Sequence, residues 1–407
     1  MELQHIRIQG FKSIEDVTFE PKTGFSCLVG SNGSGKSNFC DALIFFKNVV
    51  VKGVSSAIQE IGEKNLLTDS QEISFSLKAN HPGSSNVYDY YLSINIQEKK
   101  IIAENLSTEI FSIYSRKQDA ADKLDLEKLQ NFLNDILVQL EGYKEESKKD
   151  KKSKNKKFED IMKTLEKNKK QSFRDNIQDE LNSDKTALSF YYENESIYKY
   201  IENLNVFRIN PLVPKLPNKI FNDSNLLMYG ENLATILLAL QKDKNKWATL
   251  HELLSLIVPS VDEVSLQKGD FDDQLMLNFK ENGKVFPAIS ISDGTIYTLA
   301  ILTAILWNQD KDSLIIIEEP ERGIHPQAIV EIISFIKEAV LEKKLSIIIT
   351  THSETVVRSC TLDELWIVDK IKGCTKLKNA KESNPHLKEA SLDQAWLMNL
   401  LNGGLPW

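Results

Sequence analysis

Eight consecutive residues near the N-terminus have the types and spacing of a phosphate-binding loop. The pattern is GxxxxGK followed by Ser or Thr, and the residues are Gly30, Ser31, Asn32, Gly33, Ser34, Gly35, Lys36 and Ser37. Small residues let backbone N–H groups curl around a phosphate, the lysine reaches the β- and γ-phosphates of a nucleotide, and the hydroxyl binds Mg²⁺. An apolar run over 25–29 precedes the motif and a helical pattern follows it, so an accidental glycine turn is the weaker explanation. These residues therefore predict a site for a nucleoside triphosphate and Mg²⁺.

Two carboxylates end a second apolar run, which begins at Leu314. They are Glu318 and Glu319, and in a parallel sheet ligands bind beyond the carboxyl ends of the strands. Successive side chains on a strand point in opposite directions, so the two acids cannot do the same job. One would complete the Mg²⁺ shell and the other would polarise an attacking water molecule. A solvated strand end is the alternative, and the phosphate-binding loop upstream argues against it.

Two further polar segments are candidates for contacts with a phosphate. His352 follows a third apolar run, and its ring could hydrogen-bond a γ-phosphate, although a lone histidine is more often structural. The segment 290–295, which contains Ser292 and Gly294, precedes a helical pattern. Two interpretations of this segment stay open. Its polar side chains cap the helix, or Ser292 and the N–H of Gly294 bind a phosphate at the helix N-terminus.

The spacing of apolar side chains predicts the elements that position these residues. From residue 296 onward, helical patterns alternate with continuous apolar runs, which indicates a parallel sheet covered on both faces. Alternation at 2–9 and 15–20 predicts two half-buried strands near the N-terminus. Strand patterns at 72–80, 90–97 and 100–104 predict a small antiparallel β region after the first helix. We therefore expect an α/β fold of the P-loop NTPase class, with a mixed sheet, an antiparallel β subdomain and a mostly helical insertion.

The chain is expected to divide into three parts. Residues 1–114 would form the N-terminal half of a head, 115–200 an inserted helical arm, and 201–407 the C-terminal half. The arm carries a helical stripe of leucines and, between Lys144 and Lys170, twelve lysines against six acids. This Lys-rich tip would either contact nucleic-acid phosphates or be a solvated loop, and the sequence leaves both interpretations open.

Composition limits the class of protein. The 407 residues carry a net charge of −8, which is unlike a protein that coats DNA by charge alone. No run of about 18 apolar residues occurs, so no membrane span is expected. The start, MELQHIRIQGFKS, alternates like a strand rather than a signal peptide. The four cysteines show no CxxC pairing, and we expect reduced thiols in a cytoplasmic protein.

Taken in order, the polar segments resemble the motifs of ABC-type ATPase heads of the RecF and SMC class. The segments LVGSNGSGKSNFCDAL, ISDGT, IIIEEPERGIHP and IIITTHS look like the Walker A, signature, Walker B and switch-histidine motifs of that class. The similarity is greatest to the OLD-like and RecF-like ATPases of prokaryotes, and it extends to the ending GGLPW. It covers about half of the chain and leaves out the arm. The signature is SDGT rather than the SGGQ type of transporters, which argues against a transport subunit.

This resemblance implies a mechanism in which two heads meet face to face, as a homodimer or a higher oligomer, and bury two ATP molecules. Ser292 and Gly294 would contact the γ-phosphate of the ATP that the partner head binds. Glu318 falls on the Mg²⁺-side acid, Glu319 on the water-activating acid and His352 on the switch histidine.

Three positions depart from the pattern of the class or leave a choice. Glu318 stands where much of the superfamily has Asp, so direct Mg²⁺ ligation is open. His325 falls on the loop that crosses the dimer interface, or it is a turn residue. The Q-loop glutamine is not obvious, and Gln59 and Gln71 are both candidates.

Two functions from different classes fit these observations. In the first, an ATPase cycle acts on DNA, in repair or in anti-phage defence. In the alternative, an ATP-driven sensor or scaffold holds and releases a separate effector protein, such as a nuclease or a toxin. Only 55 residues follow His352, so we expect no appended acid-rich nuclease domain, and any effector would act in trans.

Overall fold

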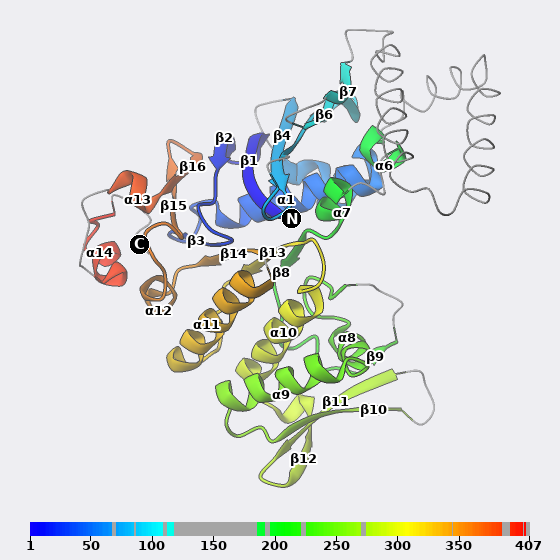
Figure 1. Ribbon diagram of the computed structural model, residues 1–407, viewed down its shortest axis with the longest axis vertical. Coiled ribbons are helices and arrows are strands. Elements are labelled where there is room, and N and C mark those ends of the chain that lie inside the picture. Colours follow the sequence, from blue (N-terminus) through cyan, green and yellow to red (C-terminus); the bar gives the residue numbers. More distant parts are fainter. Residues whose placement is uncertain are drawn as a thin grey trace, which may run out of the picture.

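Three β-sheets and the helices packed on them make up the described part of the chain (Figure 1). The computed structural model describes residues 1–66, 71–84, 87–108, 112–117, 185–191, 196–220, 225–269, 274–343, 345–384, 391–401 and 403. The Lys-rich tip and most of the expected arm, together with nearly all of the GGLPW ending, lie outside these residues.

A six-stranded sheet forms the centre of the molecule, in the order β16-β15-β3-β14-β13-β8. All neighbouring strands in it are parallel except β16, which pairs antiparallel with β15. The expected mixed sheet is therefore confirmed. Its strands are β3 (Phe25–Val29), β8 (Asn205–Phe207), β13 (Leu314–Glu318), β14 (Ser346–Thr351), β15 (Leu365–Ile371) and β16 (Cys374–Asn379).

The apolar runs of the central strands are continuous because both faces of the sheet are covered. On β13, Ile315 and Ile317 pack with α10 (Asp293–Asn308) and α11 (Pro326–Lys343). Leu314 and Ile316 belong instead to a second core, which contains α1 (Lys36–Lys52). Side chains that alternate along one strand thus enter two cores, and the strand is held in one register.

An antiparallel sheet covers α1 on its other side (Figure 1), in the order β2-β1-β4-β5-β6-β7. The apolar side of this sheet meets α1 through aromatic contacts, such as that of Phe46 with Phe75 at 5.0 Å between ring centroids. The predicted antiparallel subdomain is therefore present. Its strands are β1 (Glu2–Phe11), β2 (Ile14–Phe19), β4 (Glu72–Asn80), β5 (Val87–Asn95), β6 (Lys100–Thr108) and β7 (Ser112–Lys117).

Smaller elements complete the two ends of the molecule. A third sheet, β9 to β12, lies beyond α9 at the bottom of Figure 1. The remaining elements are α2 (Val54–Ile61), η1 (Glu63–Leu66), α6 (Ala187–Tyr191), α7 (Ser196–Glu202), β9 (Asn218–Lys219), α8 (Leu233–Leu240), α9 (Lys244–Ile257), β10 (Glu263–Lys268), β11 (Gln274–Glu281), β12 (Lys284–Pro287), η2 (Ala288–Ser290), α12 (Glu354–Arg358), α13 (Ala380–Ser383) and α14 (Leu392–Leu397).

The described end of the expected arm packs on the head. Leu188 of α6 and Ile197 and Ile201 of α7 are fully buried in the same core as α1. The division at 115–200 remains a prediction, since most of that range lies outside the described residues. A search of the described helices finds none that is both long and apolar enough to cross a membrane.

Candidate nucleotide site

The P-loop joins β3 to α1 and lies at the carboxyl end of the central sheet. Lys36, the first residue of α1, is buried, and its Nζ donates hydrogen bonds to the carbonyl oxygens of Gly30 at 2.7 Å and Ser31 at 3.0 Å. Burial lowers the pKa of Lys36, while the carboxylates of Glu319 and Glu321 oppose this shift. The lysine therefore folds back over the loop, with its ammonium group on the carbonyl oxygens of the loop.

The hairpin of β15 and β16 supports the P-loop from behind. Thr375 Oγ1 donates a hydrogen bond to the carbonyl oxygen of Ser34 at 3.2 Å and lies 2.7 Å from Ser13 Oγ. Gly35 has φ +110°, and a Cβ built on it would lie 2.0 Å from Thr375 Oγ1. Only glycine combines this backbone with so close an approach. The sequence analysis gave Thr375 no role.

A line of alternating charges connects the P-loop to the Walker B strand. Ser37 Oγ donates to Glu318 Oε2 at 3.2 Å. The other oxygen of Glu318 accepts from Arg208 Nε at 2.5 Å, and Arg208 also bonds Asp41 at 2.5 Å. Lys12 bonds the second oxygen of Asp41 at 2.5 Å. The guanidinium of Arg208 thus joins two carboxylates at the edge of the site, and burial opposes but does not outweigh their attraction, so the pKa of Arg208 is raised.

Arg208 was not predicted from the sequence, although a signal for it was present. Arg208 follows the buried triplet Asn205–Phe207 directly. It therefore stands at the carboxyl end of a parallel strand, where Glu318 and Glu319 were found.

Glu319 and His352 face each other beyond the ends of β13 and β14. Glu319 Oε1 lies 3.6 Å from His352 Nδ1, and both side chains are about two-fifths exposed, at 38% and 43%. Glu319 is a non-glycine residue at φ +51°, an uncommon conformation. Its N–H donates to the carbonyl of Thr350 at 2.8 Å. The turn at Glu319 leaves its carboxylate open to solvent beside the histidine.

A third acid of this corner, Glu321, is half-buried. Its Oε1 accepts from Thr351 Oγ1 at 2.7 Å and from the N–H of His352 at 3.3 Å, while its buried Oε2 has no hydrogen-bond partner among the residues that the structure describes. Burial raises the pKa of Glu321. Glu321 thus holds the backbone of His352, a contact that was not predicted from the sequence.

Ser292 and Gly294 lie at the N-terminus of α10. Ser292 is the N-cap residue, and its Oγ accepts from the N–H of Thr295 at 3.1 Å. A Cβ on Gly294 would lie only 2.4 Å from the carbonyl oxygen of Gly323, in the turn after Walker B. The structure therefore brings these residues to that turn and bears out the capping interpretation. A phosphate contact in trans stays a prediction.

The other sequence candidates lie at exposed positions. His325 precedes α11, and its Nδ1 accepts from the N–H of Gln327 at 3.3 Å, as expected of a turn residue. Its role at a dimer interface remains a prediction. Gln59 on α2 and Gln71 just before β4 are both exposed, and the choice of Q-loop glutamine stays open.

The donor set beside the P-loop fits Mg²⁺. The hydroxyl of Ser37 and the carboxylate of Glu318 are hard oxygen donors, which Mg²⁺ prefers, and they already approach each other. In the described ranges no group of three or more His, Cys, Asp or Glu side chains could hold a metal ion. A site with two protein ligands, Ser37 and Glu318, suits an ion that takes its remaining ligands from substrate phosphates and water.

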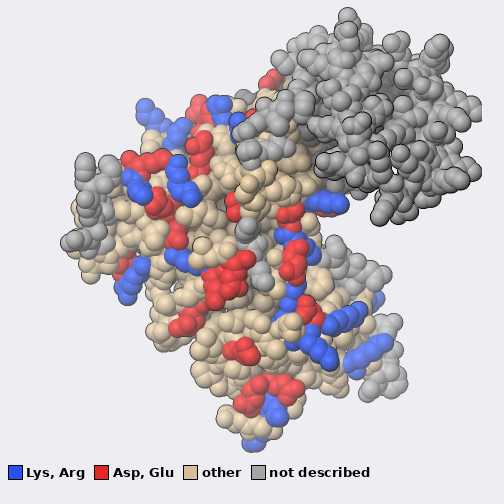
Figure 2. Space-filling view, in the orientation of Figure 1, with Lys and Arg blue, Asp and Glu red and all other residues tan. Residues whose placement is uncertain are grey.

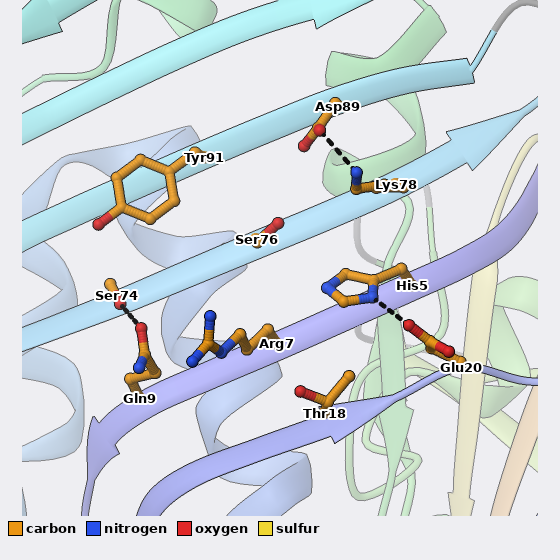
Figure 3. A pocket seen from close by; sticks show the side chains of 10 residues that line it. All are labelled: His5, Arg7, Gln9, Thr18, Glu20, Ser74, Ser76, Lys78, Asp89 and Tyr91. Carbon is orange, nitrogen blue, oxygen red and sulfur yellow. Dashed lines mark hydrogen bonds and ion pairs between the residues drawn. The ribbon is translucent and has the colours of Figure 1, made fainter.

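The antiparallel sheet carries a polar hollow of about 470 Å³ on the side chains that point away from α1 (Figure 3). Arginine and lysine side chains in its lining are balanced by acids, so the hollow offers no surplus positive charge to a phosphate. The ion pairs at the hollow are His5 with Glu20 at 3.0 Å, Arg7 with Asp16 at 2.6 Å and Lys78 with Asp89 at 2.9 Å.

Comparison with known proteins identifies the family. A family profile described as "AAA domain, putative AbiEii toxin, Type IV TA system" matches residues 25–358, which is more than half of the 407 residues. The chain belongs to this AAA-domain family. The match begins at β3 and ends with α12, and so includes every motif residue described above.

Curated relatives of this AAA-domain protein are similar over shorter segments. The chromosome partition protein Smc of Methanocaldococcus jannaschii is 28% identical over 133 residues, which are 28% of this chain and 11% of the relative. The DNA replication and repair protein RecF of Azobacteroides pseudotrichonymphae is 30% identical over 112 residues, 26% of this chain and 27% of the relative. With the family match, these similarities confirm an ABC-type ATPase head of the RecF and SMC class.

Solved structures of Smc heads also resemble the chain. One is the Smc head domain of Pyrococcus furiosus, with an extended coiled coil and bound to the C-terminal domain of ScpA. It is 14% identical with a TM-score of 0.49, and the match covers 98% of each chain. The SMC head domain of Thermotoga maritima is 12% identical with a TM-score of 0.44, covering 93% of this chain and 99% of that one.

Proposed function

We propose that this protein is an ATPase that hydrolyses ATP between two heads. The observation that carries the proposal is the convergence of Lys36, Ser37, Glu318, Glu319 and His352 at the carboxyl ends of three adjacent strands. A P-loop, a hard-oxygen pair, an exposed carboxylate and a histidine beside it are the parts that phosphoryl transfer to water requires.

Each residue has a separate task in this mechanism. Lys36 leaves the loop carbonyls and binds the β- and γ-phosphates. Ser37 and Glu318 hold Mg²⁺, which neutralises phosphate charge when it is bound. Glu319 accepts a hydrogen bond from the attacking water and polarises it. His352, 3.6 Å from Glu319, orients that carboxylate and contacts the γ-phosphate.

The signature motif acts on the partner's nucleotide in this proposal. Ser292 and Gly294 stand at the start of α10, a 16-residue helix whose positive end favours an anion. Asp293, in the first turn of α10, is neutralised by Lys215 at 2.5 Å, which limits its repulsion of a phosphate. A homodimer or a higher oligomer built in this way would complete each ATP site with a second head.

We further propose that the ATPase cycle acts on DNA. The relatives are a chromosome partition protein and DNA replication and repair proteins, and this supports a role in repair. The family description names a toxin–antitoxin system, which supports a role in defence. On the described part of the face in Figure 2, basic and acidic side chains are interspersed. The lysine-rich sequence 144–170 is the candidate for direct DNA contact, with a solvated loop as its alternative.

The test is steady-state ATP turnover by the purified protein, with and without duplex DNA, at low and moderate salt. We expect Glu319→Gln to bind ATP and to lose nearly all turnover, about 100-fold or more, because it removes the carboxylate that polarises water. Glu15→Gln, the same change at an exposed position on β2, is the matched control and should turn over like wild type.

Three outcomes are informative. Unchanged turnover in Glu319→Gln would contradict the catalytic assignment. Stimulation by DNA that weakens with salt would support direct DNA binding. Turnover that DNA does not affect would favour the alternative, an ATP-driven scaffold that releases a separate effector, and co-purification would then identify the effector.

A further inference from the structure

Tyr297 links the signature helix to the Walker B strand. It lies on α10, one turn after Gly294, and is 1% exposed. Its Oη is 2.8 Å from the carbonyl oxygen of Glu318 and 3.0 Å from that of Glu319. One hydroxyl proton is thus shared between the main-chain carbonyls of both acids.

The backbone that Tyr297 contacts is strained. Glu319 has φ +51°, which L-residues other than glycine adopt with a steric penalty. Such a conformation persists only where several contacts fix it. Here the N–H of Glu319 donates to Thr350, and its carbonyl accepts from the N–H of Arg322 at 3.0 Å as well as from Tyr297. Tyr297 supplies the one side-chain contact among these three.

The N-terminal turns of α10 touch the Walker B segment at a second point. The close approach of Gly294 to Gly323 sets the distance between the helix and the turn that follows Glu319. These two contacts fix the start of α10 against both ends of the segment 318–323. The direction in which Glu319 points therefore depends on where the signature helix sits.

We propose that Tyr297 is a positioning residue that aims the carboxylate of Glu319 by holding its strained backbone from the signature helix. This inference rests on the proposed function, since it assumes that Glu319 polarises the attacking water. A tyrosine hydroxyl is protonated at neutral pH and therefore serves as a donor to both carbonyls.

The test is Tyr297→Phe, which removes only the hydroxyl and preserves the buried ring. We expect kcat to fall about 10- to 100-fold, because a small misplacement of a reacting group has an effect of this size, while the KM for ATP stays within about twofold. The ATP-bound dimer should also persist longer. The matched control is Tyr200→Phe, the same change at a buried tyrosine on α7 in the other core, which should match wild type.

Combination with Glu319→Gln separates positioning from a structural role. If Tyr297 acts through Glu319, Tyr297→Phe should lower the residual single-turnover rate of Glu319→Gln by less than about twofold, since interacting residues are non-additive. An equal loss of rate in both backgrounds, or a rise in KM with unchanged kcat, would overturn the inference. If Tyr297→Phe is fully active while Glu319→Gln is inactive, the inference on Tyr297 is refuted and the proposed function stands. Full activity of Glu319→Gln would instead refute the proposed function.

Discussion

Arg208 offers a quantitative test of how the site balances its charges. We consider Arg208→Gln, which removes the cation and shortens the side chain. In the native protein, the guanidinium bonds both Glu318 and Asp41 at 2.5 Å. In the variant Asp41 keeps Lys12 as its ion-pair partner, whereas Glu318 keeps the hydroxyl of Ser37 but loses its ion pair. The substitution therefore leaves one carboxylate without a cationic partner.

The cost follows from the burial of these groups. Truncating one partner of a fully buried ion pair costs about 3–5 kcal/mol, and of an exposed pair about 0–1 kcal/mol. The side chains of Arg208 and Glu318 are 25% and 12% exposed, which lies between the two limits. We expect the free energy of unfolding to fall by about 2 kcal/mol. Tm should fall by roughly 2 °C, because the entropy of unfolding grows with chain length.

Mg²⁺ should reverse part of this loss. Without Arg208, the charge of Glu318 is no longer balanced, and we expect this stronger attraction for a cation to outweigh the loss of the orientation that Arg208 gives the carboxylate. A cation that binds the native state stabilises it by mass action. Thermal unfolding in a nucleotide-free Mg²⁺ titration should therefore show a larger rise in Tm for Arg208→Gln than for wild type. Lys12→Gln, which removes a cation from Asp41 alone, is the control and should respond like wild type. Equal Mg²⁺ responses in all three proteins would refute the reasoning.

Two further predictions concern Ser292 in the signature motif and the half-buried Glu321. Ser292→Arg should leave ATP binding by the monomer intact and block ATP-dependent dimerisation, because the large cation would occupy the space of the partner's phosphate. Light scattering with ATP measures this, and normal dimerisation would contradict the trans role. Burial raises the pKa of Glu321, so native stability is lost as pH rises from the ordinary carboxyl pKa through the raised value. In urea unfolding across that interval, Glu321→Gln should lose stability less steeply than wild type, and parallel pH profiles would exclude this contribution.

The sequence predicted the parts of the site that lie on single contiguous motifs. The P-loop, with an apolar strand before it and a helix after it, stands where expected, because GxxxxGKS imposes its own local conformation. Glu318 and Glu319 were likewise placed correctly, because acids that follow an apolar strand of a parallel sheet lie at the carboxyl edge of that sheet. Glu318 faces the P-loop and Glu319 the histidine, so the two acids point apart as predicted, but the turn at Glu319 produces this division rather than alternation along the strand, which ends at Glu318.

The sequence could not predict contacts that depend on tertiary register. Thr375 reaches Ser34 only because β15 pairs with β3 and its hairpin partner folds back over the loop. Tyr297 has the spacing of an ordinary core residue on an apolar helix. The partner of its hydroxyl is known only once the turn at Glu319 is placed. The positive φ of Glu319 was equally hidden, because glutamate carries no signal for that backbone conformation.

Arg208 gives a structural reason why position 318 can be a glutamate instead of an aspartate. Glutamate has one methylene more than the aspartate common in the superfamily that this chain resembles, and a longer side chain has more rotamers to lose before it can hold a metal ion. Arg208 removes that freedom by binding Oε1, which leaves Oε2 facing the hydroxyl of Ser37. Strand β8 is the neighbour of β13 on the side away from the P-loop strand β3. A cation at the end of β8, such as Arg208, can therefore bind Glu318 without blocking Ser37. Under the proposed function, strand order would thus allow a glutamate to hold Mg²⁺ where an aspartate would be expected.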